Sequence, residues 1–258
     1  MTNVSKHLSE FDLIKSYFAP LAASAEGAFG LTDDAAVITP PTGQSLVVTT
    51  DALVEGVHFL SDDTPQDIAA KLLRVSLSDL ASMGAVPAFY SLAIAINSDI
   101  SSDWLKAFAE SLAADQAKFG ITLIGGDTVS TPGPLTFSLT AMGLVGIGQE
   151  LRRSGAQLGD DIWVSGTIGD GALGLRAATG EIADISDAHR NFLLSRYRRP
   201  QPRTLLGPEL IGHVNAAIDI SDGLIADLGH ICATSKVGAD IHIAAVPLSL
   251  EAQSITSK

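Results

Sequence analysis

Six aspartates stand at the ends of apolar runs or at the turns that follow them. They are Asp34 in TDDAAV, Asp51 in VVTTDALVEGVHF, Asp79 in VSLSDLASMG, Asp127 in IGGDTVS, and Asp219 and Asp222 in AIDISDG. A single aspartate in such a place is an ordinary turn or helix-cap residue, because its carboxylate accepts hydrogen bonds from nearby backbone N–H groups. Six of them among small and apolar residues favour a second interpretation, in which they converge on one site.

Convergence of these carboxylates would have a chemical consequence. Two unit charges about 4 Å apart repel by about 4 kcal/mol at an effective dielectric near 20. The carboxylates would therefore raise one another's pKa or disrupt the site unless cations neutralised them. Carboxylate, water and phosphate oxygens are the usual ligands of Mg²⁺. The residues alone leave open both the capping interpretation and that of a metal held against phosphate.

Three further motifs have both a structural and a functional interpretation. The glycines of Gly125–Asp127 either let a ligand approach the backbone or simply form a tight turn after a strand. His58 in EGVHF is either a structural histidine or part of the site. Arg152 and Arg153 in RRSGA either grip phosphate oxygens in a fork or form an exposed pair.

One motif match is not supported by its surroundings. GDGALG at 169–174 fits the G-x-G-x-x-G pattern of dinucleotide-binding proteins. That pattern needs a second strand ending in an acid, and the EIADIS segment that follows leads into another helical stretch. The sequence also lacks a G-x-x-x-x-G-K-[ST] loop, so phosphoryl chemistry would use another scaffold.

Strand and helix signals alternate along the chain, which predicts an α/β or mixed α+β fold. A cluster of glycine, arginine and aspartate near 146–161 predicts a boundary between domains at 1–148 and 149–258. Strands are expected at 35–39, 46–51, 88–96, 121–127, 135–145, 161–166, 216–220 and 239–246, and helices at 64–84, 102–119, 171–180, 186–197 and 222–235.

Composition excludes several classes of protein. The 258 residues are 46% hydrophobic and carry a net charge of −13, so we expect a folded chain that binds neither nucleic acid nor anionic lipid. The single cysteine, Cys232, excludes an internal disulfide and a zinc-thiolate cluster. No apolar run approaches the ~18 residues of a membrane span, and the N-terminus has no signal-peptide core. We expect a cytoplasmic protein.

Together these motifs resemble one known family. TDDAAV, TTDALVEGVHF, VSLSDLASMGAVP, LIGGDT, LRRSGAQLGD, the R-P-x-P-R of Arg199–Arg203 and AIDISDGLIADLGHI occur in the order found in thiamine-monophosphate kinases. That family lies in the superfamily of aminoimidazole ribonucleotide synthetase. The resemblance covers nearly the whole chain, and it implies an N-terminal α/β domain that dimerises through its strands, followed by a C-terminal α/β domain.

The resemblance also implies an activity and a set of site residues. The expected reaction transfers the γ-phosphate of ATP directly to thiamine monophosphate with several Mg²⁺ ions, and the protein is expected to be a homodimer. The implied ATP contacts are Gly126, Asp127, Arg153 and Ser221, and the implied substrate contact is His58. The implied metal ligands are Asp34, Thr49, Thr50, Asp51, Asp79, Asp127, Asp219 and Asp222.

The C-terminal part departs from the family pattern. Nothing after Pro247 resembles the GGEDYEL-type segment or the later aromatic residue that lies against the thiamine. We therefore expect the second domain to be incomplete, and we assign no residue to those two roles. Two alternatives remain at this stage: another ATP-dependent synthetase of the superfamily, or a non-catalytic assembly protein of the hydrogenase-maturation type.

Overall fold

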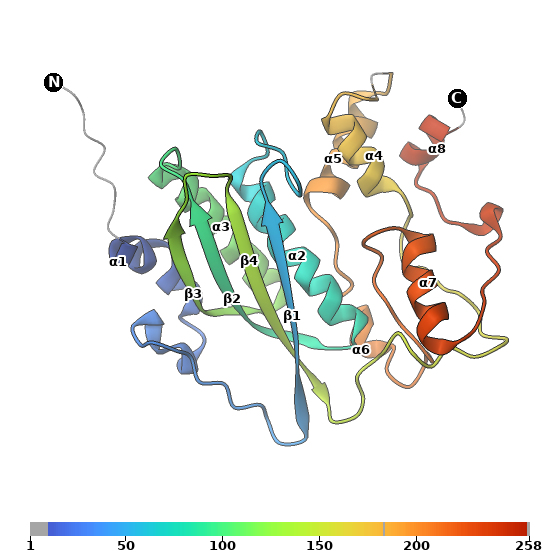
Figure 1. Cartoon of the computed structure of the whole chain (residues 1–258), viewed down its shortest axis with the longest axis horizontal. Coiled ribbons are helices and arrows are strands. Elements are labelled where there is room, and N and C mark those ends of the chain that lie inside the picture. Colours follow the sequence, from blue (N-terminus) through green and yellow to red (C-terminus); the bar gives the residue numbers. More distant parts are fainter. Residues whose placement is uncertain (1–9, 183, 257–258) are drawn as a thin grey trace.

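A four-stranded mixed sheet forms the centre of the first half of the chain (Figure 1). The computed structural model describes residues 10–182 and 184–256. The strands β1 (Gln44–Val54), β2 (Val86–Ile96), β3 (Thr122–Ser130) and β4 (Thr136–Gly146) lie in the order β1-β4-β2-β3. β4 is antiparallel to both neighbours, whereas β2 and β3 are parallel. β1 and β3 are therefore the two edges of the sheet.

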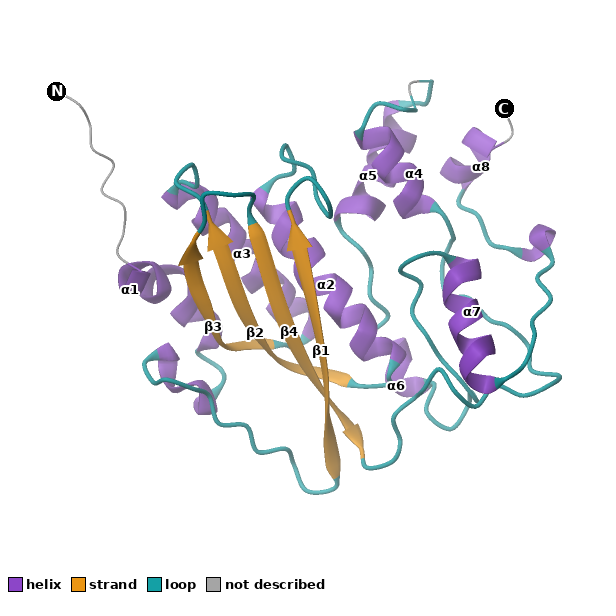
Figure 2. Ribbon diagram, in the orientation of Figure 1, coloured by secondary structure: helices purple, strands orange, loops and turns teal. Residues whose placement is uncertain are grey.

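Two long helices cover one face of this sheet (Figure 2). In α2 (Pro65–Ser82), the Thr64 side chain accepts the Asp67 N–H and proline occupies the first turn, as the sequence predicts. In α3 (Ser102–Phe119), Ser101 caps the first turn and the left-handed Gly120 ends the helix. α3 supplies the crossover that the parallel pair β2 and β3 requires.

The main hydrophobic core lies between the sheet and the helices. Alternate residues of β1, β2 and β4 turn toward the helices, and Leu53, Leu92 and Leu139 are at most 5% exposed. Phe108 contacts the rings of Trp104 and Phe137, with ring centroids 5.3 and 5.2 Å apart. The opposite face of the sheet is partly covered, because the N-terminal segment packs there against Phe89 and Met142, whereas Thr50 of β1 is exposed.

The segment before β1 is helical and then irregular. It contains α1 (Glu10–Leu13), η1 (Ile14–Phe18), η2 (Ala19–Ala22) and η3 (Glu26–Leu31). The strand predicted at 35–39 is wrong, because there the backbone makes only an isolated bond from the Val37 N–H to the Gly27 carbonyl, at 2.8 Å. An extended segment becomes a strand only when it pairs along its length.

The second half of the chain contains helices and loops. Its helices are α4 (Asp170–Ala178), α5 (Asp187–Arg198), α6 (Leu206–Glu209), α7 (Leu224–Ser235), η4 (Ile243–Ala245) and α8 (Leu250–Thr256). The predicted helices at 171–180, 186–197 and 222–235 are confirmed, with α7 beginning two residues late. α4, α5 and α8 pack together above α7 in Figure 1.

The strands predicted at 161–166, 216–220 and 239–246 are wrong, since none of the described residues after Gly146 forms a strand. The apolar residues are present, but the segments lack ladder partners, and Trp163 and Ile243 are 88% and 87% exposed. The mixed α/β class is confirmed and rests on the sheet of the first half. No helix within the described ranges is long and apolar enough to cross a membrane.

The glycines of the GGD motif lie inside β3, so the tight turn expected there is wrong. The register between β2 and β3 shifts at Tyr90 and Ser91, which leaves Ile124 as an extra residue before Gly125. A Cβ atom at Gly126 would lie 1.9 Å from the Leu92 carbonyl oxygen, whereas a Cβ at Gly125 would meet nothing within 4 Å. Gly126 therefore allows the close pairing of β3 with β2.

These two neighbours form a matched pair for a stability test. Gly126→Ala should lower the free energy of unfolding by about 3 kcal/mol, because the new methyl group forces β3 away from β2. Gly125→Ala should change it by less than about 1 kcal/mol. Urea unfolding followed by circular dichroism measures both. Equal losses in the two variants would contradict the close approach at Gly126.

Candidate functional site

The first two acids of the candidate site lie between β1 and α2. Alternation along β1 turns Thr49 and Asp51 toward the helix layer. The Ser76 hydroxyl donates to Asp51 Oδ2 at 2.7 Å, and the Thr49 hydroxyl donates to Asp79 Oδ2 at 2.5 Å. Ser76 and Asp79 lie three residues apart on α2 and so share one helix face. Strand and helix thus hold the two carboxylates in place through hydroxyl donors.

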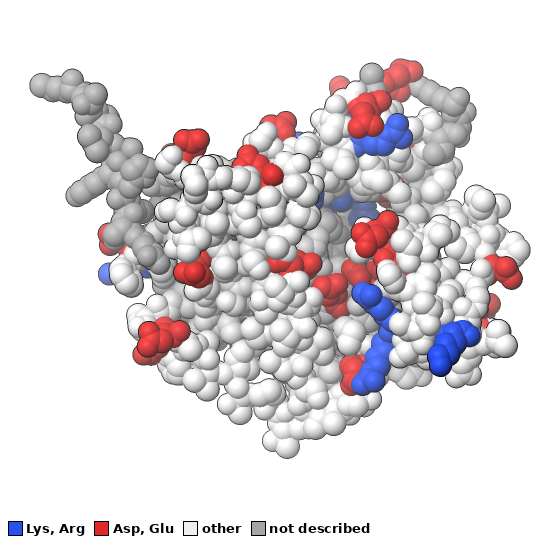
Figure 3. All heavy atoms as spheres, viewed as in Figure 1, with Lys and Arg blue, Asp and Glu red and all other residues white. Residues whose placement is uncertain are grey.

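A third acid reaches this place from the second half of the chain. Asp219 lies in the loop before α7, where the Ser78 side chain lowers its pKa and the Asp219 charge in turn raises the pKa of Asp79. We call Asp51, Asp79 and Asp219 the carboxylate cluster. Figure 3 shows acidic and basic side chains side by side along the boundary between the two halves. Sequence positions 51, 79 and 219 are therefore brought together only by the tertiary fold.

Burial makes negative charge unfavourable in the carboxylate cluster. It raises the pKa of Asp79 above its ordinary value, and the charges of Asp219 and Asp51 raise it further, against the Thr49 hydrogen bond and the Arg153 charge. Burial likewise raises the pKa of Asp219, with a contribution from Asp227. Such a cluster is stabilised by a cation, and grouped acids of raised pKa are typical of functional sites.

Asp227 decides between the capping and the site interpretation of the AIDISDG motif. Its Oδ2 atom accepts the backbone N–H groups of Ser221, Asp222 and Gly223, at 3.0, 3.1 and 3.1 Å. Neither Asp219 nor Asp222 caps α7, whose N-cap residue is Gly223. Sequence reasoning missed Asp227, although an acid in the first turn of a predicted helix is a signal for this role.

Arg153 is placed to act on the carboxylate cluster. Its side chain is exposed, and its charge lowers the pKa of both Asp79 and Asp219. The loop that carries it is fastened to the end of α7, because the Thr234 and Ser235 hydroxyls both donate to the Arg153 carbonyl, at 3.0 and 3.2 Å. Arg152 instead pairs with Glu150 on the surface. The two arginines of RRSGA therefore have different surroundings.

Asp34 and Asp127 lie outside the carboxylate cluster. Both line a cavity of about 670 Å³ beside β2, β3 and the N-terminal helices, and Gly126 lines it too. Asp51 belongs to edge strand β1 and Asp127 to the opposite edge strand β3, so three strand spacings, about 14 Å in all, separate their backbones. The Asp127 carboxylate accepts the Thr128 N–H at 2.9 Å. One chain therefore does not bring these two acids to the carboxylate cluster.

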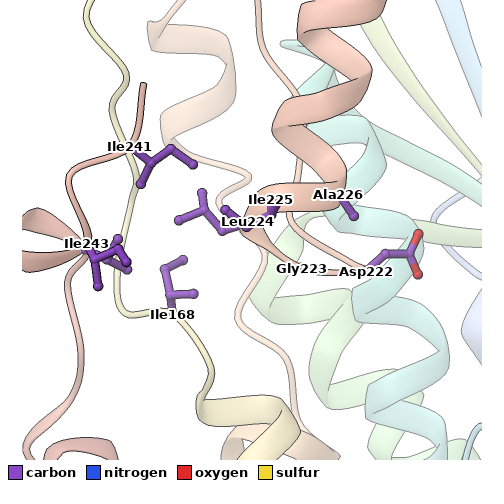
Figure 4. Close-up of a pocket in the computed structure, with 9 residues that line it drawn as sticks. Ile168, Asp222, Gly223, Leu224, Ile225, Ala226, Ile241 and Ile243 are labelled. Atoms are coloured by element: carbon purple, nitrogen blue, oxygen red, sulfur yellow. The ribbon is translucent and has the colours of Figure 1, made fainter. Parts of the chain in front are cut away.

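Thr50 and Asp222 occupy two further places. Thr50 turns to the face of the sheet opposite the helices, where its hydroxyl lies 2.9 Å from that of Thr140. Asp222 lines a cavity of about 580 Å³ whose other walls are mainly apolar, and Figure 4 shows its carboxylate directed away from Ile168 and Ile243. Within residues 10–182 and 184–256, no three side chains of histidine, cysteine, aspartate or glutamate lie close enough together to hold a metal ion. Convergence of all six acids is thus only partial.

His58 lies in the exposed turn that follows β1. The Val54 N–H donates to His58 Nδ1 at 3.0 Å, and the His58 N–H donates to the Val54 carbonyl at 2.9 Å. Because Nδ1 accepts a hydrogen bond, the proton of the neutral ring is on Nε2. The ring thus has a structural role at one nitrogen and a hydrogen-bond donor at the other, so both interpretations of this histidine are compatible with the fold.

The raised pKa of Asp79 leads to a test of the carboxylate cluster without metal. A raised folded-state pKa stabilises the fold below the ordinary carboxyl pKa, and this stability is lost as the pH rises through the folded-state value. Asp79→Asn retains an acceptor for Thr49 but does not ionise. Its melting temperature in EDTA should therefore exceed that of the parent chain by a margin that grows from pH 4 to pH 7.

The control for this measurement is Asp99→Asn, an exposed acid outside the carboxylate cluster. It should show no such growth with pH. Addition of Mg²⁺ at pH 7 should raise the melting temperature of the parent chain more than that of Asp79→Asn, because the cation neutralises the repulsion. A difference in melting temperature that stays constant from pH 4 to pH 7 would show that ionised Asp79 does not destabilise the fold.

Comparisons with known proteins agree on the family. The family described as AIR synthase related protein matches with its N-terminal domain over residues 32–145 and its C-terminal domain over 157–257. The thiamine-monophosphate kinase of Escherichia coli (strain K12) is 46% identical over 243 residues, which are 93% of this chain and 73% of the relative.

Two solved structures are similar over most of the chain. The thiamine-monophosphate kinase of Stenotrophomonas maltophilia K279a has a TM-score of 0.80 and 47% identity, covering 86% of this chain and 70% of that one. AaThiL complexed with AMPPCP and TMP has a TM-score of 0.77 and 29% identity, covering 97% and 78%. The motif order, the fold and these likenesses lead to the same result: the chain belongs to the thiamine-monophosphate kinase family.

Proposed function

We propose that the chain transfers the γ-phosphate of ATP to the phosphate of thiamine monophosphate, giving thiamine diphosphate and ADP. The observation that carries this proposal is the carboxylate cluster at the boundary between the two halves, where the pKa values of Asp79 and Asp219 are raised, in a chain 46% identical to a thiamine-monophosphate kinase. The complex of AaThiL with AMPPCP, an analogue of ATP, and TMP supports the two ligands. The synthetase and assembly-protein alternatives are not favoured.

The acids suit Mg²⁺ as the metal. Carboxylate and hydroxyl oxygens are hard ligands, and the raised pKa of Asp79 and Asp219 reflects a charge that a cation would offset. When bound, Mg²⁺ neutralises the phosphate oxygens and lets two anions approach. The ligands we propose are Asp34, Thr49, Thr50, Asp51, Asp79, Asp127, Asp219 and Asp222.

Other residues of the chain are assigned to the two substrates. We assign Arg153, Ser221, Gly126 and Asp127 to ATP. The N–H groups of 221–223 are already bound to Asp227, so the loop before α7 offers side chains rather than a backbone nest to the phosphates. Phosphoryl transfer depends mainly on positioning and charge neutralisation, and the acceptor phosphate needs no protein base near neutral pH. His58 Nε2 is free to donate to this acceptor.

A second copy of the chain is part of this proposal. Asp127 lies on the opposite edge strand from Asp51, and an open sheet edge is a site for pairing with another chain. We propose a homodimer in which the Asp34 and Asp127 of one copy approach the carboxylate cluster of the other. We place the activity in the cytoplasm, where Cys232 remains a free thiol.

Turnover is the direct test of the reaction. The chain with Mg²⁺, ATP and thiamine monophosphate should release ADP and form thiamine diphosphate, and EDTA should stop both. Asp51→Asn should lower the rate at least about 100-fold, because one charged oxygen that offsets phosphate repulsion is lost. Chromatography of the thiamine esters measures the product. An absence of thiamine diphosphate in the presence of Mg²⁺ and both substrates would refute the proposal.

Mixing two inactive variants tests the shared site. If the second copy supplies Asp127, a dimer of one Asp51→Asn chain and one Asp127→Asn chain has one site with both changes and one intact site. Random exchange should then restore about a quarter of the parent activity. Each variant alone should remain inactive. No recovery in a mixture whose exchange is confirmed by mass would show that one chain supplies the whole site.

A further inference from the structure

Lys71 is a buried cation that the proposed reaction does not use. It lies on α2 and is 7% exposed. Its Nζ atom donates to the His58 carbonyl oxygen at 2.9 Å and lies 3.5 Å from the ring centroid of Tyr197, near the end of α5. Burial lowers the pKa of Lys71 to about 8, and the charge of Arg198 acts in the same direction, against Asp63 and Asp67. The ammonium thus links an exposed turn of the first half to a helix of the second.

The turn that Lys71 holds consists of residues 55–60, here called the His58 turn. Its His58 carbonyl is bound by Lys71, while the His58 N–H and Nδ1 are bound by the Val54 backbone. Three polar groups of this residue are therefore fixed, and the exposed ring edge with Nε2 is the part that remains to contact a ligand. The direction of Nε2 depends on where the turn lies.

A second tie joins the same turn to α5. Asp63, whose side chain is 2% exposed, accepts the Leu60 N–H at 2.9 Å and the Arg198 Nε–H at 2.6 Å. Arg198 directly follows Tyr197 on α5, so both ties end on the same turn of that helix. The next residue, Arg199, pairs with Asp67 of α2 at 2.5 Å. The His58 turn is thus held between α2 and α5 at two points.

An ammonium is a costly way to fill this position. Taking a charge out of water is unfavourable unless partners compensate, and an apolar side chain of similar length would fill the same volume. Lys71 keeps one carbonyl and one aromatic face as its direct partners. Unlike an apolar side chain, the ammonium donates a hydrogen bond to the His58 carbonyl. We therefore infer that Lys71 serves to position the His58 turn.

We propose that Lys71 is a positioning residue, which ties the His58 turn to α5 and thereby directs His58 Nε2 toward the acceptor phosphate. This inference rests on the proposed function for the role of His58. It assigns to Lys71 no contact with either substrate. In this proposal Tyr197, in the second half of the chain, helps to position His58, the acceptor contact in the first half.

The first test reads the histidine ring without any substrate. The ¹⁵N NMR spectrum should show His58 as the Nε2–H tautomer, identified by its loss in His58→Gln. In Lys71→Met the released turn should let the Val54 bond to Nδ1 open, and the signal should move toward a mixture of tautomers. Lys106→Met removes an exposed lysine of α3 and should leave the signal unchanged. An unchanged His58 signal in Lys71→Met would overturn the proposal.

The second test separates the two substrates. Lys71→Met should raise the KM for thiamine monophosphate about tenfold, with the KM for ATP changed less than about twofold. Lys71→Arg, which keeps a charged donor, should recover most of the loss. A purely structural role would raise both constants together or neither. If the parent chain shows no turnover, the proposed function fails, and the NMR signal alone decides the role of Lys71.

A folding control keeps both tests decisive. If Lys71→Met loses its helical circular dichroism, Tyr197→Leu takes its place, because it removes the aromatic face and leaves the ammonium. The expected changes have the same direction and a smaller size. A folded Tyr197→Leu variant with the parent's His58 signal and the parent's KM for thiamine monophosphate would contradict the link between α5 and the His58 turn.

Discussion

Repulsion among carboxylates that the fold holds together is the constraint on which the candidate site depends. Asp51 comes from a strand, Asp79 from a helix and Asp219 from a loop of the second half, and burial raises the pKa of the latter two. The hydroxyls of Ser76 and Thr49 hold Asp51 and Asp79 in place. Rigid placement of unfavourable charge stabilises a bound cation more than it stabilises the empty fold.

The acids of the site and those that position it form two groups, which differ in the hydrogen-bond donors that their carboxylates accept. Asp227 is buried, and one of its oxygens accepts three consecutive backbone N–H groups, so it fixes the loop that carries Asp219. Asp63 likewise binds a backbone N–H and an arginine. The carboxylate cluster, by contrast, is held by side-chain hydroxyls. The structural acids thus position the segments on which the site depends.

The boundary between the halves is where these parts meet. Cations of each half face groups of the other: Lys71 contacts the Tyr197 ring, and Arg198 and Arg199 pair with Asp63 and Asp67. Asp219 and Arg153 reach the carboxylate cluster across the same boundary. The positions of Asp219 and Arg153 beside Asp79 therefore depend on how α5 and the loop before α7 lie against α2.

The sequence by itself determined what local physics and motif order can specify. Strand and helix signals correctly predicted β1 to β4, α2 and α3, and the order of short motifs identified the family. Strands at 161–166 and 216–220 were wrongly predicted, because apolar content indicates a strand but only a hydrogen-bonded neighbour makes one.

Tertiary structure decided which acids meet. Sequence spacing placed Asp51 and Asp127 in similar motifs, yet the strand order β1-β4-β2-β3 puts them on opposite edges, and order in a sheet depends on long-range pairing. Asp227, and neither Asp219 nor Asp222, accepts the backbone N–H groups before α7, and the bond from Lys71 to the His58 turn has no signature in either local sequence. The carboxylate cluster joins Asp51 and Asp79 to Asp219, more than a hundred residues further along the chain, so only the fold could reveal it.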